Sequence, residues 1–128
     1  MYTRFKYTLF SKRRIIMKIA FVVSENLRIY AEDIEFFTEA HDSIVINRAN
    51  SLDDRSAKYL KAVGYEINEF SPDFERYGEA APEKIVDDAD KIILFHYGSP
   101  EVKRIAEYAR EKNKPHEMIL RPLIIKLH

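Results

Sequence analysis

Short runs of apolar residues alternate with longer segments of helical periodicity along most of this chain of 128 residues. The runs with the length of a β-strand are Lys18–Val23, Ser43–Asn47, Tyr65–Phe70, Lys91–Phe95 and His116–Leu120. Between them, apolar residues recur every three or four positions, which is typical of helices that pack one face on a core. This alternation predicts right-handed βαβ units, and therefore a parallel sheet in an α/β fold.

The polarity of each run indicates its place in the sheet. Lys18–Val23 and Lys91–Phe95 are apolar after their first lysine, as expected for parallel strands that are buried on both faces. Tyr65–Phe70 mixes acidic, amide and apolar side chains, which is typical of an edge strand. We therefore predict a three-layer, Rossmann-like sheet with the strand order 3-2-1-4-5 and a topological switch between the first and fourth strands. Leu123–Leu127 is a candidate sixth strand.

The ends of the expected helices carry recognisable signals. Ser51 has the properties of an N-cap, with Asp54 three residues later in the acid position of a capping box, and Gly64 is placed to end that helix. Ser99 followed by Pro100 predicts the start of the last helix. The expected apolar stripes are Tyr30, Ile34, Phe37 and His41; Ala57, Leu60 and Val63; Ile85, Val86 and Ala89; and Val102, Ile105, Ala106 and Ala109.

The first sixteen residues differ from the rest of the chain, because they contain five basic residues and no acidic one. Met17 leads directly into the first strand, so residues 1–16 are interpreted as a peripheral basic extension from an upstream start codon, and residues 17–128 as one Rossmann-like domain. In the alternative interpretation, Phe5, Tyr7 and Leu9 alternate with polar residues to form an added edge strand.

Composition narrows the possible partners. The formal net charge is zero, which argues against a nucleic-acid-binding protein, and no apolar run approaches the length of about 18 residues of a membrane span. The chain has no cysteine, so we expect no disulfides and a cytoplasmic location. The absence of glutamine, together with a charged share of 33%, suggests a thermophile-like composition.

Parallel sheets of this type bind ligands beyond the carboxyl ends of their strands, and short polar side chains gather at these positions. Arg48 stands between two asparagines and could hold a phosphate or carboxylate in bidentate fashion. Ser51 and Ser99 have the simpler interpretation of helix caps, Asp54 that of a partner for the helix dipole, and Gly98 that of a turn residue. The candidate ligand-binding residues are Ser24, Asn26, Arg48, Asn50, Ser51, Asp54, Asp73, His96, Gly98 and Ser99.

Two kinds of site receive no support from the sequence. The four histidines are scattered and there are no thiols, so we expect no metal site and no bound cofactor. With three glycines in the whole chain, the glycine-rich loop of a typical phosphate site cannot be built.

From Lys18 to about Glu117 the sequence resembles the SLOG superfamily, a Rossmann-like group that contains DNA-processing proteins and the "lonely guy" phosphoribohydrolases, and it is most similar to the small YspA-like members. The resemblance rests on motif order, and the matching segments are Ile19–Ser24, Asn50–Ala57, Gly64, Phe70–Phe74, Gly78–Pro82, Asp88–Phe95, Gly98-Ser99 and Lys114-Pro115.

The resemblance implies that the chain binds a nucleotide or a nucleotide-derived ligand, with Ser24, Asp54, Asp73 and Ser99 at positions that match the family's motifs. The departures argue against N-glycosidic chemistry. Asn47–Asp54 keeps the acid of the family's loop but lacks its glycines, and an Arg-Asn pair expected near Pro82-Glu83 is missing. Glu101-Val102 replaces a Gly-Thr pair, and Ile105 stands where hydrolytic members have a catalytic glutamate.

Three hypotheses follow. We favour a sensor or ligand-binding protein without robust catalysis and without catalytic residues. The alternatives are an enzyme that processes nucleosides or nucleotides, with Asp73, Glu101 and His96 as acid–base groups, and a homodimeric interaction module with a degenerate pocket that uses Phe74 and Tyr77.

Overall fold

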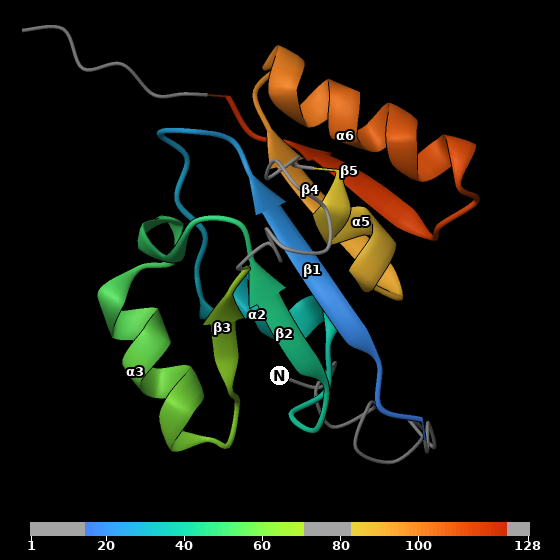
Figure 1. The fold of residues 1–128 in the computed structure, drawn as a ribbon. Coiled ribbons are helices and arrows are strands. Elements are labelled where there is room, and N and C mark those ends of the chain that lie inside the picture. Colours follow the sequence, from blue (N-terminus) through green and yellow to red (C-terminus); the bar gives the residue numbers. More distant parts are fainter. Residues whose placement is uncertain (1–14, 71–82, 123–128) are drawn as a thin grey trace, which may run out of the picture.

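The computed structural model describes residues 15–70 and 83–122 (Figure 1). The expected sixth strand, Asp73, Phe74, Tyr77 and the basic extension up to residue 14 lie outside these residues. In chain order the elements are β1 (Lys18–Val23), α2 (Ala31–Phe37), β2 (Ser43–Ile46), the 3-10 turn η1 (Ala49–Ser51), α3 (Asp54–Ala62), β3 (Ile67–Glu69), α5 (Lys84–Asp88), β4 (Lys91–His96), α6 (Pro100–Glu111) and β5 (His116–Leu120).

The five strands form one sheet in which every neighbouring pair is parallel. Their order is β3-β2-β1-β4-β5, so the predicted fold class and strand order are confirmed. The apolar strands β1 and β4 are neighbours at the centre, with Phe21 paired to Ile93, and the mixed strand β3 lies at one edge. The topological switch therefore lies between β1 and β4.

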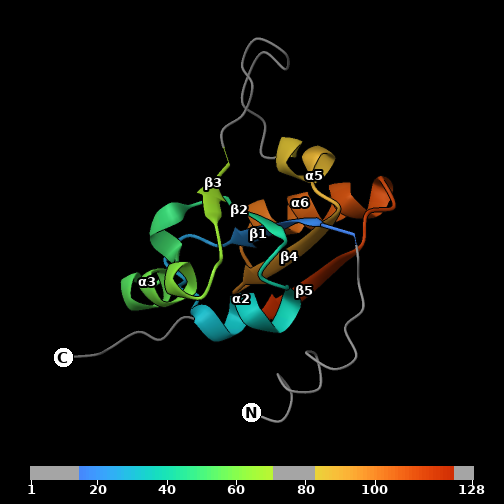
Figure 2. The same cartoon turned by 90° about the horizontal axis from the view of Figure 1, so that it is seen from below.

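Successive residues of the central strands feed two separate cores, because strand side chains alternate between the faces of a sheet. Phe21, Ile44 and Phe95 point to the face that Ile34 of α2 and Leu60 of α3 cover. On the other face, α5 and α6 pack over a second set of strand residues, which includes Ala20, Val22, Val45, Ile92 and Leu94. Figure 2 shows the sheet between these two helical layers.

The end of α3 follows the sequence prediction, whereas its start does not. Gly64 adopts φ +105° after the helix, and its N–H donates to Lys61 O while the Tyr65 N–H donates to Leu60 O, as in a Schellman motif. At the start, the N-cap is Asp53, whose carboxylate accepts from the Ser56 N–H at 3.3 Å. The assignment of Ser51 as the N-cap was therefore wrong.

The apolar stripe that we expected on α3 is only partly buried. Leu60 is buried, but Ala57 is exposed and Val63 is 45% exposed. Ser56 takes the buried position instead, because its hydroxyl accepts a hydrogen bond from the Ala31 N–H at the start of α2. Sequence periodicity gave no sign of this polar contact between helices.

Helix α2 is shorter than predicted, and His41 lies beyond its end. The Thr38 hydroxyl donates to Ile34 O at 2.6 Å, and the buried Asp42 carboxylate accepts from Glu39 N–H and Met17 N–H. These contacts favour a turn after Phe37 over further helix, since each satisfies a backbone group outside the helical ladder. None of the helices in the described ranges is both long and apolar enough to cross a membrane.

Candidate functional site

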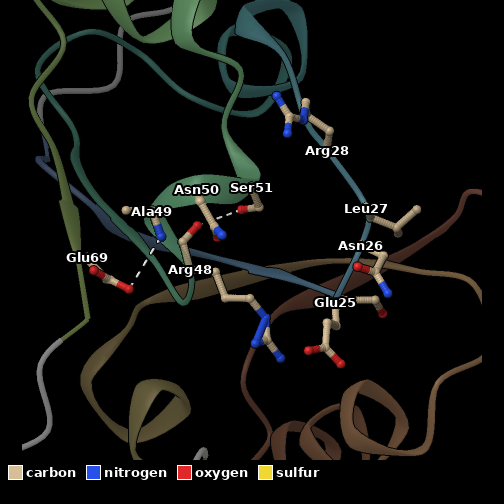
Figure 3. Close-up of a pocket in the computed structure, with 10 residues that line it drawn as sticks. Glu25, Asn26, Leu27, Arg28, Arg48, Ala49, Asn50, Ser51 and Glu69 are labelled. Carbon is tan, nitrogen blue, oxygen red and sulfur yellow. Dashed lines mark hydrogen bonds between the residues drawn. The ribbon is translucent and has the colours of Figure 1, made fainter.

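The loops that follow β1 and β2 enclose a polar cavity of about 680 Å³ at the carboxyl edge of the sheet (Figure 3). Small-molecule sites in proteins have volumes of roughly 300–1,000 Å³, so this cavity is large enough for a ligand such as a nucleoside. The lining residues are Ser24, Glu25, Asn26, Leu27, Arg28, Arg48, Ala49, Asn50, Ser51 and Glu69.

The two loops are fastened to each other behind the cavity. Ile29 and Leu52 form a single parallel bridge outside the main sheet, in which the Ile29 N–H donates to Ser51 O at 2.7 Å and the Asp53 N–H donates to Ile29 O at 3.0 Å. Both bridge residues are buried. The cavity wall is thus held by the backbone of both loops.

Local hydrogen bonds shape each loop further. Asn26 adopts φ +70°, a left-handed conformation that asparagine tolerates better than most residues. Ser51 is buried and its hydroxyl donates to Arg48 O at 2.6 Å, which closes the turn η1. The Asn47 side chain pairs with both backbone groups of Val23, so it continues the contact between β2 and β1 past the end of the strand.

The hydroxyl groups of Ser24 and Ser99 are 2.7 Å apart and form a hydrogen bond. Ser24 is only 1% exposed, and it follows β1 directly. Ser99 is the N-cap of α6, as predicted, but its side chain makes no capping hydrogen bond to the helix. The contact therefore links the cavity wall to the start of α6 across the topological switch.

The side chain of Arg48 extends from the loop after β2 to the first turn of α6, where its guanidinium group meets Glu101. Its Nη2 lies 2.9 Å from Glu101 Oε1, and the two side chains are 32% and 44% exposed. Nε of Arg48 is buried and has no hydrogen-bond partner among the described residues. A buried donor without a partner from the protein is uncommon.

Three further charged side chains from the described part of the chain line the cavity besides Arg48. Arg28 lies 4.0 Å from Asp53 Oδ1, and Glu69 accepts a long hydrogen bond of 3.4 Å from the Ala49 N–H. Glu25 is exposed at the tip of the loop after β1. Among the described residues, two arginines and two glutamates line the cavity, so their formal charges cancel.

Five of the predicted residues line the cavity, namely Ser24, Asn26, Arg48, Asn50 and Ser51. Asp54, His96, Gly98 and Ser99 do not line it, although Ser99 reaches its wall through Ser24. The cavity lies over β1, β2 and the end of β3, so it is displaced from the crevice that we expected between the first and fourth strands.

The sequence prediction did not include the other five lining residues, which are Glu25, Leu27, Arg28, Ala49 and Glu69. Glu69 ends the edge strand β3 next to Ile46 of β2. The strand order that we predicted contains this signal, because neighbouring parallel strands bring their carboxyl ends to the same edge. The partnership of Arg48 with Glu101 had no such signal, since 53 residues separate the two side chains.

Of the acid–base groups in the enzyme hypothesis, His96 and Glu101 are not among the lining residues, and Asp73 lies outside the described residues. His96 Nδ1 accepts a hydrogen bond from the Gly98 N–H at 3.0 Å, which fixes the proton of the neutral ring on Nε2. Glu101 is paired with Arg48. Within residues 15–70 and 83–122 there is no cluster of three histidine or acidic side chains that could hold a metal ion.

Comparison with models of known protein families, with curated proteins and with solved structures gave no match for this chain.

Proposed function

We propose that this chain binds a nucleotide or a nucleotide-derived small molecule in the cavity between the loops after β1 and β2, in a sensor or binding role without robust catalysis. The observation that carries the proposal is the cavity itself, a hollow of about 680 Å³ with a polar lining at the carboxyl edge of a parallel sheet. Ligands of Rossmann-like sheets bind at this edge.

The chemistry of the lining supports a ligand with several hydrogen-bonding groups. Asn26 and Asn50 offer amide donors and acceptors, and Glu25 and Glu69 offer carboxylates that accept hydrogen bonds from hydroxyl groups. A ribose with an attached base presents such groups. The resemblance to SLOG proteins points to the same class of ligand.

The residue Ile105 of α6 favours binding of a ligand over its chemical conversion. Ile105, at the position of the catalytic glutamate in hydrolytic SLOG proteins, is 1% exposed and packs in the core between α6 and the sheet. An aliphatic side chain can neither transfer a proton nor stabilise an oxocarbenium ion. A glutamate at this position would instead place a charge in an apolar core.

A thermal-shift screen with nucleosides, nucleotides and ADP-ribose derivatives tests the proposal. A ligand at about ten times its Kd stabilises the folded state by about 1.4 kcal/mol, which corresponds to a rise in Tm of about 4 °C for a domain of this size. Ala49→Trp places an indole ring at the cavity lining and is expected to abolish the shift.

Ala57→Trp is the matched control, because Ala57 is exposed on α3 and does not line the cavity. We expect this variant to respond to the ligand like the natural chain. The proposal fails if no compound at millimolar concentration raises Tm, or if both tryptophan variants respond equally.

A further inference from the structure

Arg48 of the cavity lining is engaged in an ion pair with Glu101. Arg48 is the arginine of the lining that we expected to hold a phosphate, and its Nη2 already donates to Glu101 Oε1 at 2.9 Å. The Arg48 and Glu101 side chains are 32% and 44% exposed, so water weakens this pair as it weakens other ion pairs at a protein surface. A phosphate that binds Arg48 has to displace this carboxylate or lie beside it.

The start of α6 offers a phosphate fewer hydrogen-bond donors than most helix N-termini do. Helix N-termini attract anions through free backbone N–H groups and the helix dipole. Here Pro100 occupies the first helical position without an N–H, and the Ser99 hydroxyl is engaged by Ser24. Glu101 itself adds a negative charge to the first turn. The chain thus supplies its own anion at this place.

The second arginine of the lining does not provide an alternative phosphate site. Arg28 has a carboxylate partner in Asp53 at 4.0 Å and is 58% exposed, so its interaction with an anion is weakened by water. Glu25 and Glu69 add two negative charges to the same lining. All cations of the described lining therefore have acidic neighbours.

We propose that Glu101 is a specificity-determining residue that occupies the anion-binding position at Arg48, so that the cavity accepts a nucleoside and discriminates against its 5′-monophosphate. This inference rests on the proposed function and narrows its ligand class. A like charge placed opposite a ligand weakens the binding of that ligand, which is one way in which a site gains specificity. A ribose and base without phosphate meet the amides and carboxylates of the lining without that repulsion.

Calorimetric titration of matched pairs, such as adenosine with AMP and guanosine with GMP, tests the inference. In the natural chain we expect the best nucleoside to bind at least about tenfold more tightly than its monophosphate. Glu101→Gln removes the charge without shortening the side chain, and it is expected to strengthen monophosphate binding about tenfold while nucleoside binding changes little. Glu107→Gln, which removes an exposed charge from the same helix, is expected to leave both Kd values unchanged.

Tighter binding of the monophosphate by the natural chain, or an unchanged preference in Glu101→Gln, overturns the inference while the proposed function stands. Binding of none of these compounds overturns both.

A second experiment uses inorganic phosphate in place of a nucleotide. The Nε–H resonance of Arg48 is followed by ¹⁵N NMR while phosphate is added. Millimolar phosphate is expected to shift this resonance in Glu101→Gln and not in the natural chain, and equal shifts in both proteins contradict the inference.

Discussion

A serine at a helix N-terminus usually caps the helix with its hydroxyl, but Ser99 uses this group to contact Ser24. The backbone of Ser99 is extended and Pro100 follows it, so the local sequence predicted the start of α6 correctly. The partner of the hydroxyl could not be predicted, because Ser24 lies 75 residues away. Local signals of this kind give the position of a residue but not its long-range contact.

The two serines are expected to differ in their contribution to stability. Ser99→Ala leaves the hydroxyl of the buried Ser24 without its partner, at a cost of about 2 kcal/mol. Ser24→Ala frees the Ser99 hydroxyl to cap α6, so the cost should stay below about 1 kcal/mol. Urea denaturation of both variants measures the difference, and an equal or reversed order would contradict the assignment.

Tyr108 provides a prediction on pH dependence. Its hydroxyl donates to Asp87 Oδ1 at 2.8 Å, and this hydrogen bond to a carboxylate, with burial and the charge of Asp87, raises the pKa of Tyr108 from 10.0 to about 12. A raised pKa favours the protonated form in the folded state. The contribution to stability is therefore complete below pH 10 and is lost as the pH rises towards 12.

Tyr108→Phe removes this hydrogen bond and is expected to lower the free energy of unfolding by about 1 kcal/mol at neutral pH. The difference between the natural chain and the variant should stay constant up to about pH 10 and shrink above it. Denaturant titrations over this pH range measure it. A difference that grows above pH 10 would show that the Tyr108–Asp87 contact does not control the titration.

At the scale of elements, an arginine that follows β5 is paired with a carboxylate at the start of α2. Arg121 Nη1 donates to Asp33 Oδ2 at 2.9 Å, and Nη2 donates to Asp33 Oδ1, which makes a bidentate pair between the end of β5 and the first turn of α2. The guanidinium group also lies over the Phe95 ring, at 4.7 Å from its centroid. Burial alone would lower the pKa of Arg121, but the hydrogen bonds to Asp33 raise it.

Arg121→Lys keeps the charge but loses both the planar fork and the stacking on Phe95. We expect it to destabilise the fold by about 1 kcal/mol, and Arg121→Ala by about 2 kcal/mol, because Asp33 is only 13% exposed and loses its cation. Chemical denaturation measures both. Arg110→Lys, at an exposed position of α6, is the matched control and should have no effect; an Arg121→Lys variant as stable as this control would refute the role of the fork.

Elements could be predicted where hydrophobic pattern and local signals agree. The bounds of β1 are as expected, and Gly64 ends α3 through its backbone. The start of α3 and the end of α2 were missed because side chains decide them, Asp53 at one end and Thr38 at the other. Such side chains compete with neighbouring polar residues for the same backbone groups, so sequence spacing alone does not identify the one that wins.

At the scale of the whole molecule, the strand order followed from polarity, since the apolar runs β1 and β4 are central and the mixed β3 is at the edge. The same order brings the carboxyl ends of β1, β2 and β3 together, and this predicted half of the candidate site. The pairing of Arg48 with Glu101 could not be predicted, because the two residues lie in distant segments of the chain. The sheet topology thus predicted part of the lining of the cavity, whereas a contact between distant segments had to be read from the structure.

Ligand binding in the cavity between the loops after β1 and β2 is the central claim, and an ¹⁵N–¹H NMR titration with nucleosides tests it most directly. We expect saturable shifts of backbone amides in residues 24–28 and 48–51, which line the cavity, and unchanged amides on the outer face of α6. Shifts confined to other parts of the chain, or no shifts with any nucleoside at millimolar concentration, would contradict the claim.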